Sequence, residues 1–395
     1  MFPVALISNT FKARGNNNLN YYQHNMSRQD TEDYLRIFLQ DIPLMDVRAP
    51  VEFNKGAFPS SQNIPLLNDS QRQAIGTRFK QEGQDAAIAL GLEMATPEIR
   101  EHRMQQWKHF ANTYPEGYLY CFRGGLRSRT TQAWLKEAGL NYPLVKGGYK
   151  SMRTFLLQQL EADLQQIPFV ILSGLTGSGK TQTLKKTDHH IDLEGLANHR
   201  GSAFGCDVHD SQPTQINLEN QLSIACLKHW HQAPKSRLLL EDEGKRIGRL
   251  TLPTSFSEKM AHSPYIILEQ DLDRRVANIT EDYIANSWPL YQQHYQEAAK
   301  DKFSSFVLDN LARIKKRLGG IRYKKMQSSF TLALHHLFAA GESDLFNEGI
   351  RLLLVEYYDP MYHYQLQNKQ SELLFRGTEP EILAWAAEHL QTVKL

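Results

Sequence analysis

Residues 168–181 read PFVILSGLTGSGKT, and this stretch decides the fold class. An apolar, β-rich run is followed by a glycine-rich loop of the form G-x-x-x-x-G-K-T and then by a helical pattern through Leu184. Strand, loop and helix in this order form a P-loop, whose backbone N–H groups and lysine bind a diphosphate and whose threonine can reach Mg²⁺. The predicted phosphate-binding residues of the loop are Gly174, Gly177, Ser178, Gly179, Lys180 and Thr181.

The P-loop predicts an α/β, P-loop NTPase-like domain with a parallel sheet over residues 167–312. The loop itself does not say whether the diphosphate belongs to a nucleotide, because it contacts phosphates while other segments read the base. Arg274 opens a predicted helix, and Arg200 lies in a polar stretch, 198–205, that has no helical or strand period. Both arginines are candidate ligands of a departing pyrophosphate.

Acidic side chains at the end of a second buried strand would complete a Mg²⁺ site beside the P-loop. Such residues follow the apolar runs that end near positions 191 and 240. The second run offers Glu241, Asp242 and Glu243, and the first offers Asp192 and Glu194; of these, Asp192, Glu241 and Asp242 are the predicted Mg²⁺-linked acids. A solvated acidic turn is the alternative for each of them, and the metal is an expectation of the sequence.

A second anion-binding loop is predicted around Cys121. The apolar run 117–120 leads into this cysteine, and Arg123, two glycines, Arg127 and a helical pattern follow it. Backbone N–H groups of such a loop and the N-terminus of the helix favour the thiolate over the thiol. Cys121 is therefore the predicted nucleophile with both arginines as positive charges beside it, and a buried structural cysteine is the alternative.

The charge balance excludes a uniformly basic protein. Lys plus Arg number 45 against 43 Asp plus Glu, a net charge of +2, so any binding of nucleic acid depends on a local patch. A basic segment supplies one, with Arg313, Lys315, Lys316, Arg317, Arg322, Lys324 and Lys325. RNA backbone is its predicted partner, and a merely solvated helix face is the alternative.

The composition predicts a soluble, cytoplasmic protein. Its 3 cysteines cannot form a disulfide framework and suit a reducing compartment, where Cys206 and Cys226 are expected to be core or incidental residues. No apolar run is long enough to span a membrane, so no membrane partner is expected. The predicted organisation is a poorly ordered extension over 1–25, a first domain over 26–150, a linker helix over 151–166, the P-loop domain over 167–312, and the basic segment with a helical C-terminal region over 313–395.

Two motifs of the first domain resemble the rhodanese fold of sulfurtransferases. One is the segment DVRAPVEF at 46–53, and the other is the strand, Cys121 loop and helix. Most sulfurtransferase loops place four residues between the cysteine and the next arginine. Here five residues separate Cys121 from Arg127, as in rhodanese-fold phosphatases and arsenate reductases.

Further segments sharpen the resemblance. These are YCFRGGLRS at 120–128, GGYK at 147–150, DLEGLANHRGSAFG at 192–205 and EDE at 241–243 with Ile247 and Gly248. Together with the order of the two domains, they resemble bacterial tRNA 2-selenouridine synthases over about residues 26–330.

The resemblance implies an enzyme that replaces sulfur by selenium in the 2-thiouridine at the wobble position of certain tRNAs. It implies geranyl diphosphate and selenophosphate as co-substrates, an S-geranylated intermediate, and an enzyme that supplies selenophosphate as a partner. On this interpretation the P-loop binds geranyl diphosphate, with Mg²⁺ as an expected cofactor. Cys121 accepts selenium as a selenopersulfide-like species, and the basic segment binds the tRNA anticodon region.

Other classes of protein remain open at the level of the sequence. A rhodanese-type sulfurtransferase fused to an ATP-dependent kinase of a small molecule would also combine a reactive cysteine with a P-loop. The five-residue spacing after Cys121 is compatible with a phosphatase, although no general acid is evident in the loop. A catalytically idle RNA-binding module would need neither the cysteine loop nor the P-loop.

Overall fold

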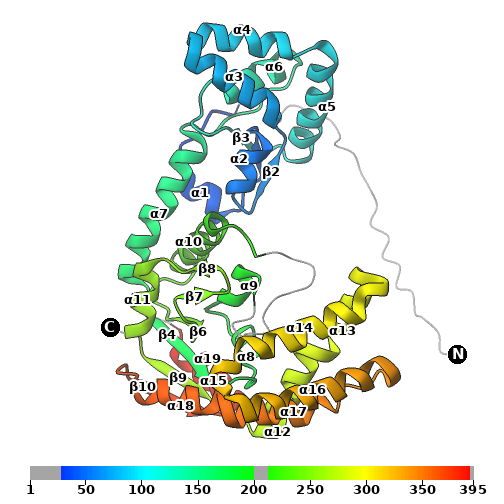
Figure 1. The fold of residues 1–395 in the computed structure, drawn as a ribbon. Coiled ribbons are helices and arrows are strands. Elements are labelled where there is room, and N and C mark those ends of the chain that lie inside the picture. Colours follow the sequence, from blue (N-terminus) through cyan, green and yellow to red (C-terminus); the bar gives the residue numbers. More distant parts are fainter. Residues whose placement is uncertain (1–27, 200–211, 392–395) are drawn as a thin grey trace, which may run out of the picture.

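The computed structural model describes residues 28–199 and 212–391, and the predicted extension over 1–25 lies outside these ranges. Figure 1 shows an N-terminal α/β unit that is joined by one long helix, α7 (Gly148–Gln166), to a larger part of the molecule. The predicted linker helix over 151–166 lies within α7. None of the described helices is long and apolar enough to cross a membrane.

The N-terminal unit contains a three-stranded parallel sheet with the order β2–β1–β3. Trp107 and Leu119 are fully buried in its core, between the sheet and the surrounding helices. The elements are α1 (Tyr34–Leu39), β1 (Leu44–Asp46), α2 (Pro50–Lys55), β2 (Ser61–Asn63), α3 (Asp69–Glu82), α4 (Gln84–Met94), α5 (Pro97–Thr113), β3 (Tyr118–Tyr120) and α6 (Leu126–Glu137).

The P-loop unit is built on a five-stranded parallel sheet with the order β10–β9–β4–β6–β5. Every residue of the central strand β4 is buried, which explains its continuous apolar run, because both faces of a parallel sheet are covered. Its elements are β4 (Phe169–Gly174), α8 (Lys180–Leu184), β5 (His190–Ile191), α9 (Leu193–Ala197), α10 (Gln215–Gln232), β6 (Leu238–Glu241), the hairpin β7 (Arg246–Ile247) and β8 (Leu250–Thr251), α11 (Thr254–His262), β9 (Tyr265–Leu268), β10 (Leu373–Gly377) and α19 (Glu379–His389).

Strand β10 corrects the prediction that the C-terminal region is helical throughout. It pairs in parallel with β9 at the edge of the sheet, and α19 then packs its Ile382 and Trp385 on the same sheet. The apolar run of β10 is short, and its partner strand is remote in sequence. Periodicity within the C-terminal region therefore could not reveal the pairing.

Helices between β9 and β10 form a separate apolar core that extends from Val276 to Leu354. This core continues across the predicted boundary at residue 312, which falls inside α14. The elements are α12 (Leu272–Thr280), η2 (Glu281–Ala285), α13 (Ser287–Tyr295), η3 (Gln296–Ala298), α14 (Ala299–Arg313), α15 (Lys315–Leu318), α16 (Gly320–Ala340), α17 (Phe346–Leu353), η4 (Leu354–Tyr358) and α18 (Asp359–Gln367).

Helix α10 connects the two α/β units. Its Asn217 accepts a hydrogen bond from the Ala57 N–H at 2.8 Å, and its Asn220 donates to the Ala57 carbonyl at 2.8 Å. Ile224 and Leu227 of the same helix are buried in a core shared with α1 and α7. The N-terminal unit is thus fixed to the P-loop unit by polar and apolar contacts in addition to the α7 connection.

Candidate functional site

The P-loop connects the carboxyl end of β4 to α8. Gly177 and Gly179 have φ values of 81° and 86°, a region that side chains rarely adopt. A Cβ at Gly177 would also lie 2.8 Å from the Arg275 carbonyl oxygen, so glycine is required there on two grounds. Lys180 folds back over the loop, and its Nζ donates to the Gly174 carbonyl at 2.8 Å.

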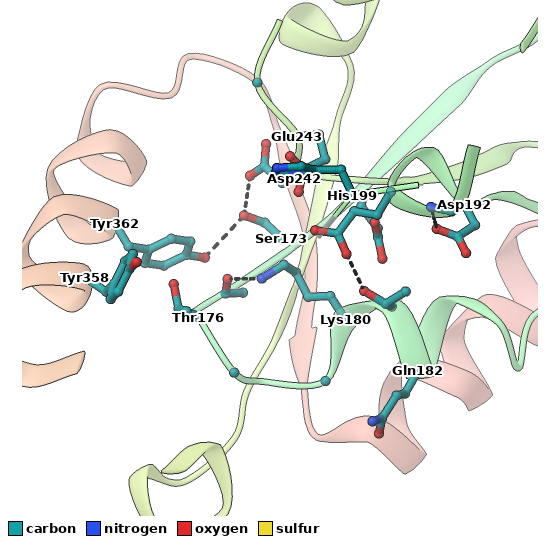
Figure 2. A pocket seen from close by; sticks show the side chains of 18 of the residues that line it. Ser173, Thr176, Lys180, Gln182, Asp192, His199, Asp242, Glu243, Tyr358 and Tyr362 are labelled. Atoms are coloured by element: carbon teal, nitrogen blue, oxygen red, sulfur yellow. Dashed lines mark hydrogen bonds between the residues drawn. The ribbon is translucent and has the colours of Figure 1, made fainter. Parts of the chain in front are cut away.

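A cavity of about 1120 Å³ opens at the carboxyl ends of β4 and β6, where ligands bind in open α/β sheets. The P-loop forms one wall, and helices of the C-terminal half form another. Figure 2 shows Tyr362 reaching toward Ser173 from the side opposite Asp242, with the two hydroxyl oxygens 3.3 Å apart. The P-loop residues Gly174, Gly177, Gly179, Lys180 and Thr181 line the cavity, whereas Ser178 is buried behind it.

Three glutamates gather beside the P-loop. Ligand oxygens of Glu194, Glu241 and Glu243 lie within 4.8 Å of one another, a spacing that could hold a metal ion. Both carboxylate oxygens of Glu241 are buried and have no hydrogen-bond partner among the described residues. Burial and the neighbouring charge of Glu194 raise the pKa of Glu241 to about 7. Burial, together with the charges of Glu194 and Glu241, raises the pKa of Glu243 to about 8.

The other predicted acids have different partners. Asp192 caps the N-terminus of α9 by accepting from the Gly195 N–H at 2.7 Å, and it forms an ion pair with Lys185. Asp242 accepts a hydrogen bond from Ser173 and forms an ion pair with Lys369 at 2.8 Å. All five candidate acids line the cavity, and Glu194, Glu241 and Glu243 form the glutamate cluster.

The sequence named the three glutamates as candidate acids but did not show that they meet. Glu241 ends β6, and the Glu243 N–H donates to the Glu241 carbonyl at 2.8 Å, so a tight turn at Asp242 joins the two glutamates. Glu194 enters the cluster from another element, and its Oε2 accepts from the Thr181 hydroxyl at 3.2 Å. That contact depends on the tertiary fold.

The structure describes one of the two predicted phosphate-binding arginines, Arg274. Arg274 is exposed on α12 and is not among the described cavity-lining residues. Its neighbour Arg275 is buried instead, donates to the Thr176 carbonyl at 2.9 Å, and pairs with Asp359. Arg200 and most of the stretch 198–205 lie outside the described residues, as does Cys206.

Cys121 lies at the end of β3 and is buried, with its Sγ 3.2 Å from the Ser128 hydroxyl. The start of α7 holds the cysteine loop in place: the Tyr149 N–H donates to the Cys121 carbonyl at 2.9 Å. Gly148 has a φ of 59°, and a Cβ there would clash with the same carbonyl. The predicted GGYK segment therefore supports the loop backbone.

The two arginines of the cysteine loop have different surroundings. Arg127 forms a two-pronged ion pair with Glu52 of α2, at 2.5 and 3.1 Å. Burial opposes ionisation of Glu52, but the hydrogen bond and charge of Arg127 bring its pKa below the ordinary value. Arg123 is exposed beside the Phe122 ring. The structure thus places Arg123 at the surface and engages Arg127 in joining α6 to α2.

All seven cations of the basic segment are exposed, at the end of α14, in α15 and in the first turns of α16. The segment contacts η4, because Arg317 donates to the Tyr357 hydroxyl at 3.5 Å and Arg322 pairs with Glu356 at 2.7 Å. Arg313 donates to Asn310 within its own helix. The fold brings this segment next to η4, whose last residue, Tyr358, lines the cavity.

Tyrosines of the C-terminal half are site residues that the sequence did not suggest. Tyr283, Tyr358 and Tyr362 all line the cavity. Burial raises the pKa of Tyr362, although its hydrogen bond with Ser173 acts in the opposite direction. Nothing in the local sequence of these tyrosines relates them to the P-loop, since they enter the site from elements far along the chain.

Comparison with known proteins identifies the family. A family model described as the tRNA 2-selenouridine synthase AAA domain matches residues 167–393. A curated tRNA 2-selenouridine synthase of Marinobacter nauticus is 48% identical over 367 residues, which are 93% of this chain and 100% of the relative. Those of Shewanella halifaxensis and Alcanivorax borkumensis are 45% and 46% identical over 365 and 359 residues, covering 92% and 91% of this chain and 100% and 99% of the relatives. The chain therefore belongs to the tRNA 2-selenouridine synthase family of enzymes.

Proposed function

We propose that this protein acts as a tRNA 2-selenouridine synthase in two steps, geranylation of 2-thiouridine at the wobble position of tRNA and replacement of the S-geranyl group by selenium. One observation supports this division most directly. A single chain carries a strand-end cysteine loop in its N-terminal unit and a P-loop cavity in another unit (Figure 1). Two anion-binding loops in two units suit two chemical steps on one base.

The first step is assigned to the P-loop cavity. The thiocarbonyl sulfur attacks C1 of geranyl diphosphate, the carbon–sulfur bond forms, and the carbon–oxygen bond breaks with its electron pair leaving on pyrophosphate. The base loses its N3 proton to solvent, which leaves a neutral S-geranyl base. Loop N–H groups and Lys180 would stabilise the charge of that leaving group. Arg275 would hold the loop in shape through the Thr176 carbonyl.

The residues beside the P-loop fit a Mg²⁺ ion. Glu241 presents a buried carboxylate without a partner among the described residues, and Glu194, Glu243 and Thr181 supply further oxygen ligands nearby. When bound, Mg²⁺ would neutralise charge on the diphosphate. Asp242 contributes less readily, since Ser173 and Lys369 already engage it.

The second step is assigned to the Cys121 loop of a rhodanese-like N-terminal unit. S-geranylation turns the base sulfur into a thiolate leaving group, so the selenium of selenophosphate can bond to C2 while the C2–S bond breaks and geranylthiolate departs and takes up a proton. Water then cleaves the Se–P bond, which releases phosphate and leaves selenium on C2. The Cys121 loop would hold the anionic donor against C2 during these steps. Arg123 is exposed near the loop and would attract the anionic donor, which a selenophosphate-forming enzyme in the cytoplasm must supply.

The tRNA is proposed to bind along the basic segment. Its exposed cations suit the phosphate backbone, whose contacts provide most of the affinity. The wobble base must leave its stack to reach a catalytic pocket, as in other enzymes that modify single bases.

Mass spectrometry of nucleosides tests the proposal. Transfer RNA that contains 2-thiouridine is incubated with the purified full-length protein and geranyl diphosphate, and selenophosphate is then added. We expect the S-geranyl nucleoside first and 2-selenouridine afterwards. ATP turnover without tRNA, together with unmodified nucleosides, would instead identify a small-molecule kinase.

A further inference from the structure

The wall of the cavity that faces the P-loop carries apolar side chains among polar ones such as Asp282 and Asn286. Ile279 of α12, Leu290 of α13 and Met361 of α18 line it together with Tyr283 and Tyr358. Met361 is 36% exposed, and the other four side chains are partly buried, so the wall is neither closed core nor free surface. We refer to these five residues as the apolar wall.

Two π-helical turns shape the apolar wall. Tyr283 lies within η2 and Tyr358 ends η4, and both tyrosines line the same cavity. A π-helical turn changes the direction of the side chains that follow in a helix, and such turns are concentrated at functional sites. Two of them on one cavity indicate that tyrosine placement there is specified by the fold.

Direct contacts fix the position of the apolar wall relative to the P-loop. Asn278 donates to the Gly177 carbonyl at 2.9 Å, and Arg275 joins the Thr176 carbonyl to Asp359 at the start of α18. Tyr362, one residue beyond Met361, interacts with Ser173 at the end of β4 (Figure 2). A ligand whose phosphates occupy the P-loop would therefore meet this wall in a defined position.

We infer that the apolar wall binds the hydrocarbon chain of the diphosphate substrate and is the part of the site that selects an isoprenoid diphosphate over pyrophosphate or a nucleotide. This inference rests on the proposed geranylation function. The cavity joins a phosphate-binding wall to an apolar wall, which matches a ligand with one anionic and one apolar end. Its volume of about 1120 Å³ also leaves room for the base that receives the chain.

Binding measurements on the full-length protein test this assignment. Isothermal titration calorimetry is used with two probes, geranyl diphosphate and inorganic pyrophosphate. Met361→Asn and Leu290→Asn should each weaken geranyl diphosphate by about tenfold or more, because each puts a polar amide against the hydrocarbon chain, while pyrophosphate affinity stays within about twofold. Val355→Asn is the matched control: Val355 lies on η4, is 47% exposed, and is not among the described cavity-lining residues.

The two levels of the proposal fail in different ways. If wild-type protein binds neither probe, or if Lys180→Ala leaves both affinities unchanged, the P-loop assignment fails and the inference fails with it. If Lys180→Ala weakens both probes but the wall variants bind geranyl diphosphate normally, the wall assignment alone is overturned. If the wall variants lose affinity for tRNA while their affinity for geranyl diphosphate is unchanged, the assignment is likewise overturned, and the wall would instead be a binding surface for a base. Thermal unfolding of each variant separates these results from misfolding.

Discussion

At the scale of single residues, the environment of each ionisable group distinguishes its role. Asp192, Glu241 and Asp242 are equivalent by sequence pattern, yet one caps a helix, one is buried in a glutamate cluster, and one pairs with Lys369. A buried carboxylate without a hydrogen bond is costly unless a proton or a cation accompanies it. The structure therefore selects Glu241 as the acid most suited to a metal.

The glutamate cluster should make stability depend on pH. Folded-state pKa values of about 7 for Glu241 and about 8 for Glu243 exceed the ordinary value, so the folded state binds more protons than the unfolded state. Without metal, we expect the melting temperature to fall as pH rises from about 5 to 8.

The double variant Glu241→Gln, Glu243→Gln should flatten this decline, as measured by thermal unfolding across that pH range without metal. Glu93→Gln, an exposed change on α4, serves as the control and should retain the wild-type slope. An unchanged slope in the double variant would mean that the cluster does not titrate in this range. Added Mg²⁺ should raise the wild-type melting temperature most at the alkaline end, where the carboxylates are charged.

Cys121 carries a prediction that separates the two chemical steps. Cys121→Ala should abolish 2-selenouridine and leave S-geranylation running, because the P-loop cavity is built from other residues. Nucleoside mass spectrometry checks both products. Cys226→Ala, a thiol buried in the P-loop unit, is the matched control and should retain both steps. Loss of both products in Cys121→Ala would point to a structural role for this thiol.

At the scale of elements, the cations of the basic segment are exposed because they lie on a short helix and at the ends of two longer ones. The short α15 and the glycine-separated start of α16 present their cations to solvent, while Leu318, Tyr323 and Met326 anchor the segment in the helical core. Arg317 and Arg322 also contact η4. A charge reversal at those two arginines would disturb packing, so a clean test uses other positions.

Charge reversal at Lys316, Lys324 and Lys325 should weaken tRNA binding and reduce its dependence on salt. Removing one ion pair between a lysine and an RNA phosphate lowers the slope of log affinity against log salt by about 1. Fluorescence anisotropy with labelled tRNA over a salt series measures both quantities. Reversal of Lys80 and Lys235, exposed cations in the two α/β units, is the control, and an equal effect there would show that the segment binds no RNA specifically.

At the scale of the whole molecule, α10 relates the two proposed sites to each other. Asn220 is buried, donates to the Ala57 carbonyl and accepts from Arg153 at 2.8 Å, so it ties α10 both to the N-terminal unit and to α7. A fixed relation between the units would let one tRNA present its base to either site from a limited set of positions.

Asn220→Ala should lower the free energy of unfolding by about 1–3 kcal/mol, because it leaves the buried Ala57 carbonyl without its donor and removes one of the two acceptors of Arg153, which keeps its ion pair with Glu219. Urea denaturation measures the change. Asn54→Ala, an exposed change on α2, should have little effect. If both variants are equally stable, the contact between the units contributes nothing to folding.

Local sequence determined the P-loop, the strand that precedes it and the cysteine loop, because these features depend on residues adjacent in the chain: an apolar run, glycines at left-handed positions, and a helix start. The same reasoning found the exposed basic segment. It also named Glu194, Glu241 and Glu243 as candidate acids, without showing that they meet.

Only the tertiary structure decided which residues from distant parts of the chain meet at the P-loop cavity. Strand β10 pairs with β9, Glu194 approaches Glu241, and the tyrosines of η2 and η4 reach the P-loop cavity through contacts between segments far apart in the chain. It also turned Arg274 to solvent and buried Arg275 against the loop. Such choices follow from the packing of whole helices and sheets, which no local period or spacing encodes.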